Sequence, residues 1–155
     1  MARNKGGHGW AKWVGLPLFV ISIFVLLYGV FVPDPRSKQV QTELENELRS
    51  ITPFPQAALI HSERSHKRNQ VLVSDRYSVP ASHAELRSYY DKELARCGWR
   101  FVSEKQLTHW GADRGGRDAH YCKGEWSANI EYVTQAADNK ADYALSLSWG
   151  LDKCS

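Results

Sequence analysis

Residues 80–101 read PASHAELRSYYDKELARCGWRF, and this stretch contains the two periodicities that decide the fold. Ser82, followed three residues later by Glu85, forms a capping box, which is typical of a helix start. The apolar face of this helix consists of Leu86, Tyr89, Tyr90, Leu94 and Cys97. Gly98 is suited to ending the helix, and from Trp99 onward the apolar residues recur at every second position, as in a strand. The chain is therefore expected to combine a helix with a β-sheet.

Strands are expected on both sides of this helix. They cover residues 57–61, 70–79, 99–109, 121–133 and 143–149, with a bulge at Lys123-Gly124 in the fourth. In the last two strands apolar and polar side chains alternate, which indicates an antiparallel sheet with one covered face. The sequence predicts an α+β domain over residues 56–155, with the order β-β-α-β-β-β and one helix on the sheet.

Residues 13–32 are predicted to form a transmembrane helix. No ionisable acid or base lies between Lys12 and Asp34, and a helix of this length spans a hydrocarbon core of about 30 Å. The basic residues before the segment place residues 1–12 in the cytoplasm and the C-terminal domain outside it.

A cleaved signal peptide is the alternative for this segment. The apolar run is longer than the usual h-region of about 7–15 residues, and no small-x-small cleavage site follows it. We therefore expect an uncleaved, single-pass signal anchor in contact with the lipid bilayer.

Residues 33–55 are expected to form a juxtamembrane helix and a linker. Val40, Leu44, Leu48 and Ile51 recur at helical spacing, which suits packing on a partner helix or on the domain. A frayed spacer is the alternative interpretation, and Pro53 and Pro55 end the helix.

Composition and charge narrow the class of protein. With 155 residues, 43% hydrophobic and 24% charged, the chain has the profile of an ordinary globular domain with an appendage. The net charge of +3 comes from Arg3, Lys5 and Lys12, which leaves 17 basic and 17 acidic residues in the rest of the chain. A neutral domain of this kind argues against nucleic-acid binding.

Three stretches of the C-terminal domain carry a resemblance. Tyr89–Leu94 followed by Gly98–Phe101, and then Tyr121–Trp126, resemble small bacterial single-pass membrane proteins with an extracytoplasmic α+β domain. The resemblance covers most of the outer part of the chain. It implies a location in the bacterial inner membrane and no particular chemistry.

Three cysteines are expected outside the cytoplasm, where disulfides persist. Cys122 and Cys154 fall on the last two predicted strands, which should form a hairpin. Pairing of Ile130 with Leu145 or Leu147 leaves the two cysteines one residue out of register, an offset that the bulge at Lys123-Gly124 would correct. We predict a Cys122–Cys154 disulfide, with Cys97–Cys122 as the competitor.

Signatures of catalysis are missing from the sequence, which lacks the common hydrolase, zinc-protease, redox and phosphate-loop motifs. We expect no catalytic residue and no cofactor. His109 and His120 flank one hairpin and, with Cys122, form a possible zinc or copper site; two polar residues facing water are the preferred interpretation. Asp113 and Asp118 are expected to be solvated, because they lie in the same glycine-rich surface loop.

Trp110, Arg114 and Arg117 are candidate contacts for a partner. They lie in or beside the hairpin loop predicted at residues 111–116, and an exposed tryptophan there would anchor a partner or a sugar ring. A tryptophan folded back over the sheet edge is the alternative.

The sequence thus favours a membrane-anchored binding or assembly module whose partner is another membrane or periplasmic protein. An accessory single-pass subunit of a larger membrane complex is the alternative, because Gly15, Ser22 and Gly29 form a line of small residues along one side of the span. A periplasmic enzyme or metal-binding protein is the third, less favoured hypothesis.

Overall fold

The computed structural model describes residues 22, 35–109, 112–134, 141–152 and 154. The chain divides after Pro33, and the fold described below belongs to the second unit, residues 34–155. The predicted span at residues 13–32 lies outside the described residues, apart from Ser22. Within the described part of the chain, no helix combines the length and apolar character needed to cross a membrane.

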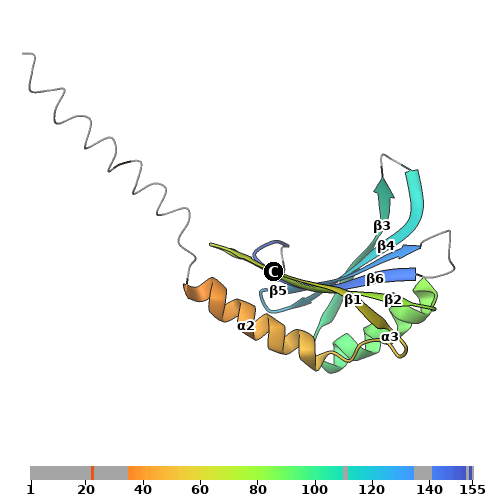
Figure 1. The fold of residues 1–155 in the computed structure, drawn as a ribbon, viewed down its shortest axis with the longest axis horizontal. Coiled ribbons are helices and arrows are strands. Elements are labelled where there is room, and N and C mark those ends of the chain that lie inside the picture. Colours follow the sequence, from red (N-terminus) through yellow and green to blue (C-terminus); the bar gives the residue numbers. More distant parts are fainter. Residues whose placement is uncertain (1–21, 23–34, 110–111, 135–140, 153, 155) are drawn as a thin grey trace, which may run out of the picture. The chain divides into compact units, whose positions relative to one another are not determined.

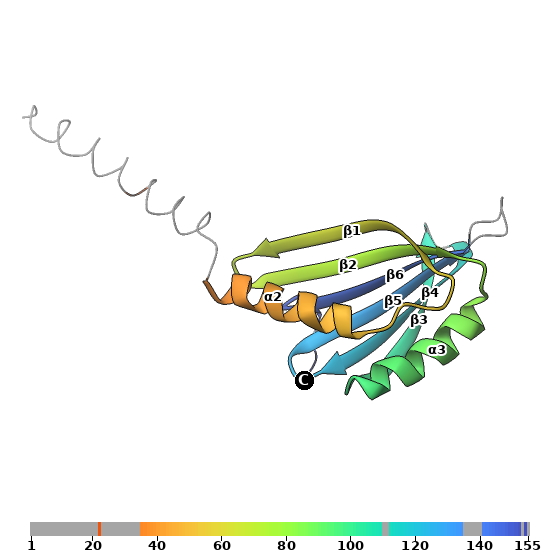
Figure 2. The ribbon, with the colours of Figure 1, turned by 60° about the horizontal axis from the view of Figure 1, so that its bottom comes forward.

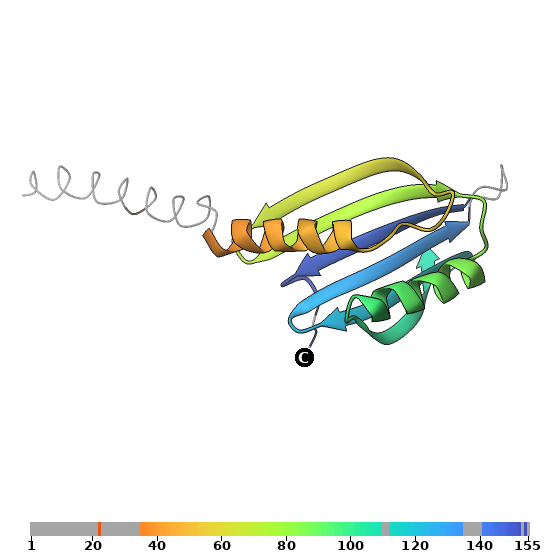
Figure 3. The same ribbon diagram turned by 90° about the horizontal axis from the view of Figure 1, so that it is seen from below.

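Two helices and six strands make up this unit. They are α2 (Pro35–Ser50), β1 (Ala58–Lys67), β2 (Gln70–Val79), α3 (His83–Arg96), β3 (Arg100–His109), β4 (Ala112–Lys123), β5 (Trp126–Thr134) and β6 (Ala141–Trp149). The strands form one antiparallel sheet in the order β1-β2-β6-β5-β4-β3 (Figure 1). Both helices lie on the same face of this sheet (Figures 2 and 3).

The predicted α+β class is confirmed, but the sheet has six strands instead of five and carries two helices instead of one. The extra strand arises because the fourth predicted strand, residues 121–133, is divided by a turn after Lys123, where a bulge was expected. Lys123 pairs with Trp126, so Gly124 and Glu125 form a two-residue hairpin loop between β4 and β5. Gly124 has a φ of 59°, and glycine is favoured at this position of hairpin turns because it adopts positive φ without steric cost.

The helix α3 begins and ends as the sequence predicted. The Ser82 hydroxyl accepts a hydrogen bond from the Glu85 backbone N–H at 3.3 Å, and the Ser82 N–H donates to the Glu85 carboxylate at 2.8 Å. Gly98 follows the helix with a φ of 83°, which ends it as a left-handed C-terminal residue does. The helix then carries the chain across the sheet from β2 to the opposite edge, β3.

The helix α2 packs on the sheet and belongs to the same core. Its buried apolar residues, with Ile51 just after the helix, are Val40, Leu44, Leu48 and Ile51. The Glu47 carboxylate accepts hydrogen bonds from Trp99 Nε1 at 2.9 Å and from Lys123 Nζ at 2.6 Å. Packing on the domain, one of the two arrangements that the sequence allowed, is therefore observed, and the compact unit includes residues before position 56.

Tyrosines fill the space between the two helices and the sheet. The Tyr90 and Tyr143 hydroxyls lie 2.8 Å apart, and the ring of Tyr143 stacks on Tyr77 at 5.1 Å. The Phe54 backbone N–H, in the connection between α2 and β1, donates to the Tyr90 hydroxyl at 3.2 Å. Burial raises the pKa of Tyr90 and, with the nearby Asp75 carboxylate, raises that of Tyr77 to about 12. These hydroxyls therefore stay protonated and keep their hydrogen bonds.

Glu93 joins α3 to the segment that follows α2. Its carboxylate accepts two hydrogen bonds from the Arg96 guanidinium, at 2.6 and 2.9 Å, and one from the Thr52 backbone N–H at 2.6 Å. The Arg96 hydrogen bonds, together with that from Thr52, lower the pKa of Glu93 from 4.5 to about 2. The ionised carboxylate is thus favoured in the folded state.

We expect Glu93→Gln to destabilise the domain at neutral pH by about 1 kcal/mol. Because the pKa is lower in the folded state, the contribution of Glu93 is complete above about pH 4.5 and is lost as the pH falls toward 2. Urea unfolding along this pH range measures the difference between variant and wild type, which should shrink with acidification. Glu63→Gln, on the exposed strand β1, is the control; a difference for Glu93→Gln that does not change with pH would contradict this account.

Candidate functional site

The face of the sheet opposite the two helices, here called the helix-free face, has polar side chains along its middle. Its central row crosses all six strands through directly paired residues: Ser103, His120, Asn129, Ser146, Ser74 and Glu63. Within this row the Ser74 and Ser146 hydroxyls lie 2.8 Å apart. His120 and Asn129 are joined by a hydrogen bond of 2.7 Å between Nδ1 and Oδ1. Short side chains of this kind leave room for a segment of chain to lie on the sheet.

The C-terminal segment uses that room. It leaves β6 after Trp149 and crosses β5, because Cys154 is bonded to Cys122 on β4. Ser127 and Ser148 are only 2% and 4% exposed, although the helices lie on the opposite face. Their hydroxyls lie 2.6 Å apart, and the Ser127 hydroxyl also donates to Asp152 in the crossing segment. The segment therefore covers this corner of the helix-free face.

Gly150 makes the turn into the crossing segment. Its φ is 74°, and a Cβ added there would overlap the backbone carbonyl oxygen of Asn69. Gly124 also has a positive φ, but an added Cβ there would meet no atom within 4 Å. Both positions favour glycine for its backbone freedom, and Gly150 additionally needs the missing side chain.

We therefore expect Gly150→Ala to lower the free energy of unfolding by about 2 kcal/mol and Gly124→Ala by only about 1 kcal/mol. Both variants carry the cost of a positive φ, and the difference between them reports the close approach to Asn69. Urea denaturation of the two variants and the wild type measures both costs. Equal destabilisation by the two substitutions would show that the contact at Asn69 is not tight.

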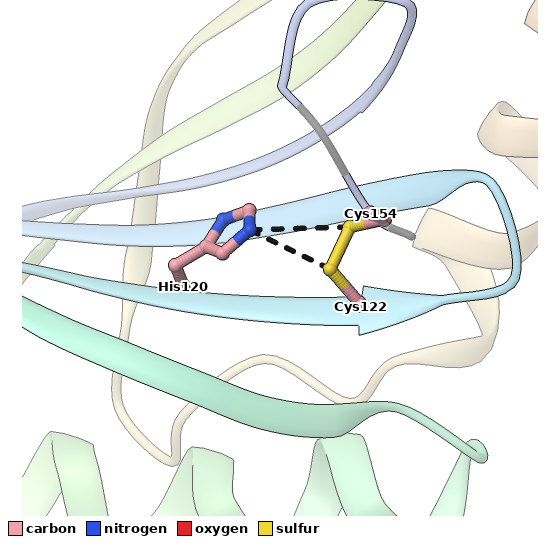
Figure 4. A group of neighbouring side chains, drawn as sticks. All are labelled: His120, Cys122 and Cys154. Atoms are coloured by element: carbon pink, nitrogen blue, oxygen red, sulfur yellow. Dashed lines mark hydrogen bonds between the residues drawn. A yellow bond between two sulfur atoms is a disulfide. The ribbon is translucent and has the colours of Figure 1, made fainter.

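The disulfide and a histidine form the chemically distinctive cluster of this face, shown in Figure 4. The Cα atoms of Cys122 and Cys154 are 5.5 Å apart. His120 Nε2 lies 3.5 Å from Cys122 Sγ and 3.9 Å from Cys154 Sγ. The side-chain oxygen of Asn129 can only accept a hydrogen bond, so His120 Nδ1 carries the proton of this bond. Nε2, the other ring nitrogen, faces the two sulfurs.

This pairing agrees with the Cys122–Cys154 bond expected from the sequence, but the reason differs. The two cysteines do not face each other across a hairpin: β5 separates β4 from β6, and Cys154 lies beyond the end of β6. The crossing segment, and not a bulge at Lys123-Gly124, brings them together. Cys97 remains a free thiol with its sulfur 3.8 Å from the Ser50 carbonyl oxygen.

The histidine pair considered at this hairpin is not formed. His109 pairs with Ala112, whereas His120 pairs with Ser103, six residues away along β3, or about 20 Å. The strand register therefore keeps the two backbones apart, and the crossing segment supplies Cys154 as the third member of the cluster. In the part of the chain that the structure describes, His120, Cys122 and Cys154 are the one group of three metal-ligating side chains found.

Asp118 lies two residues before His120 on the same face of β4. It was expected to be solvated in a loop, but β4 begins at Ala112, so Asp118 belongs to the strand and is partly buried. Burial, and then the facing Glu131 carboxylate, raise the pKa of Asp118. Among the described residues, its Oδ1 is the one buried side-chain oxygen without a hydrogen-bond partner. Asp152 adds a third carboxyl group, and the register also places two basic residues here, Arg100 opposite Cys122 and Lys105 opposite Asp118.

Of the three candidate partner contacts, Arg114 and Arg117 lie on β4. Trp110 is outside the described residues, and only the backbone of Arg114 is described. Arg117 is partly buried on β4, and its Nη1 donates to the Gly116 carbonyl oxygen at 2.9 Å. The flexible loop expected at residues 111–116 is shorter than predicted, because β4 already begins at Ala112.

In its described residues the chain is thus an α+β protein, with two helices on one face of a six-stranded antiparallel sheet and Cys154 bonded to the other face. Comparison with protein-family models, with curated proteins and with solved structures gives no match for it.

Proposed function

We propose that the protein is a membrane-anchored binding or assembly module, and not an enzyme. Residues 13–32 would anchor it in the bacterial inner membrane, with residues 1–12 in the cytoplasm and the α+β domain on the extracytoplasmic side. The uninterrupted apolar run, the basic residues before it and the cysteine pair of the domain support this arrangement. The partner would be another membrane or periplasmic protein.

The edge strand β1 is the observation that carries a binding role. Nine of its ten residues are exposed, and it pairs on one side only, with β2. An edge strand of this length offers a row of unpaired backbone N–H and C=O groups, to which a partner strand can add. Leu59 and Ile60 at its start are 57% and 53% exposed, and apolar side chains beside a free edge provide specificity for such a strand.

Charged residues along β1 suit a protein partner. Glu63, Arg64 and Lys67 give the strand charges of both signs, and Arg64 is already paired with Asp75 at 2.9 Å. Charges on an edge oppose indiscriminate pairing between copies. Their mixed sign would select a partner with a complementary pattern.

Site-specific crosslinking in the native organism tests this role. A photoreactive residue at position 66, exposed on β1, should crosslink one partner protein, and the double variant Leu59→Lys/Ile60→Lys should reduce that product at least tenfold. Val133→Lys is the matched control, because Val133 is an exposed apolar residue on a different strand. Equal crosslinking in the β1 variant and the control would reject β1 as the docking strand.

An accessory subunit of a membrane complex is the second candidate. It is favoured by the spacing of Gly15, Ser22 and Gly29, which recur every seven residues and would let another helix approach closely. Purification in mild detergent of a chain lacking residues 34–155 distinguishes the two ideas. Stoichiometric co-purification of a complex by the remaining segment supports the subunit role, and its loss supports binding through the domain.

A further inference from the structure

We propose that reduction of the Cys122–Cys154 disulfide creates a zinc site formed by the two thiolates and His120 Nε2. The oxidised cluster would hold the C-terminal segment by a covalent bond, and the reduced cluster would hold it through the metal ion. Whether the site can bind zinc would thus depend on whether Cys122 and Cys154 are reduced or oxidised. This inference does not depend on the proposed membrane anchoring or on the role of β1.

The distances in the cluster fit tetrahedral zinc. With Zn–S near 2.3 Å and Zn–N near 2.0–2.1 Å, a tetrahedral site places the imidazole nitrogen about 3.6 Å from each sulfur. The structure has 3.5 and 3.9 Å for these two separations. Only the two sulfurs must move, from a covalent bond to roughly 3.8 Å apart, and the ligand atoms of all three residues already lie within 4.8 Å of one another. The fourth position would be taken by water.

The histidine is already oriented as a metal ligand. Metal-binding histidines usually donate their second ring N–H to an acceptor, which fixes the tautomer and aims the other nitrogen at the ion. Asn129 Oδ1 has this role for His120, at 2.7 Å. The dashed lines in Figure 4 show Nε2 directed at both sulfurs.

Charged residues of both signs surround the cluster, with Arg100 opposite Cys122 and Lys105 opposite Asp118, and the cluster is open to a reductant. Asp118 and Glu131 face each other across β4 and β5, and Asp152 lies two residues before Cys154. Cys122 is only 7% exposed, whereas Cys154 is partly exposed, so an external thiolate would reach Cys154 Sγ first.

The reduction step is thiol–disulfide exchange with a dithiol. One thiolate of the dithiol bonds to Cys154 Sγ, and Cys122 leaves as a thiolate; the second thiol of the dithiol then displaces Cys154 and forms the reductant's own disulfide. Two electrons pass from the dithiol to the protein. Zinc binding keeps both cysteines as thiolates and releases any protons that they have taken up. The resulting group of Zn²⁺, two thiolates and a neutral imidazole has no net charge.

Metal titration of the full chain in detergent micelles tests the proposal. The protein is reduced with dithiothreitol, freed of reductant without air, and titrated with Co²⁺ and then Zn²⁺. We expect one equivalent of Co²⁺ to produce a thiolate-to-cobalt charge-transfer band that Zn²⁺ removes, and the oxidised protein to give no band. His120→Ala should weaken binding at least tenfold, and Asn129→Ala by about 10–100-fold. Cys97→Ser, at the free thiol, is the control and should leave binding unchanged.

Alkylation provides a readout that does not require a substituted cluster. In the reduced wild type, Zn²⁺ should protect Cys122 and Cys154 from iodoacetamide and leave the labelling of Cys97 unchanged, as measured by mass spectrometry. Reduced protein without a charge-transfer band would overturn the proposal. So would unprotected Cys122 and Cys154, or unchanged metal affinity in folded His120→Ala.

Discussion

Replacing Cys154 with serine is expected to lower the free energy of unfolding by about 3–4 kcal/mol. The bond closes a loop between residues separated by 32 positions, and opening it restores conformational freedom to the unfolded chain. It also releases the segment that covers Ser127 and Ser148. Urea denaturation without reductant measures the loss.

Cys97→Ser is the control for this experiment, because Cys97 is not bonded to another cysteine. It should change the stability by less than about 1 kcal/mol. Adding a dithiol should bring the wild type toward the stability of Cys154→Ser and leave that variant unchanged. A wild type that keeps its full stability under complete reduction without metal would show that the bond contributes little.

Replacing Leu44 with alanine is expected to cost about 2–5 kcal/mol. Leu44 lies in the middle of α2, is fully buried, and belongs to one apolar cluster with residues of the sheet and of α3. Shortening its side chain leaves a cavity between helix and sheet that close-packed neighbours fill only in part. Unfolding of the full chain in mild detergent and urea, followed by tryptophan fluorescence, measures this cost.

Asn46→Ala is the matched control, since Asn46 is exposed on the same helix. It should change the stability by no more than about 0.5 kcal/mol. A spacer helix that merely connects the domain to an anchor would tolerate both substitutions equally. An equal, small effect of the two variants would therefore contradict the packing of α2 on the sheet.

The predictable parts of this fold are those specified by neighbouring residues. The capping box at Ser82 and the glycine after α3 are local signals, and the structure has both. The role of Gly124 was ambiguous in the sequence, because bulges and two-residue turns both favour a residue with positive φ. Only the pairing of Lys123 with Trp126 distinguishes them, and this register belongs to β4 and β5 as whole strands and not to the residues beside Gly124.

The cluster on the helix-free face was less predictable for the same reason. The cysteine pair was expected from the sequence. The possible approach of His109 to His120 could not be judged there, because the register of β3 against β4 depends on two irregularities, at residues 101–103 and 107–108. His120 next to the disulfide and Asn129 behind His120 follow from pairings between separate strands. The alternation of Asn129 with apolar residues is visible in the sequence, but it indicates only on which face of the sheet the side chain lies.

Topology labelling tests the central claim, a domain held outside the cytoplasm by residues 13–32, most directly. A cysteine introduced at Glu63, on exposed β1, is treated in intact spheroplasts with a membrane-impermeant maleimide, and a cysteine introduced at Lys5 serves as the cytoplasmic control. Cys97→Ser removes the background thiol in both chains. The account predicts labelling at position 63 in intact spheroplasts, and at position 5 only after lysis. Labelling of neither position until the membrane is broken would contradict it.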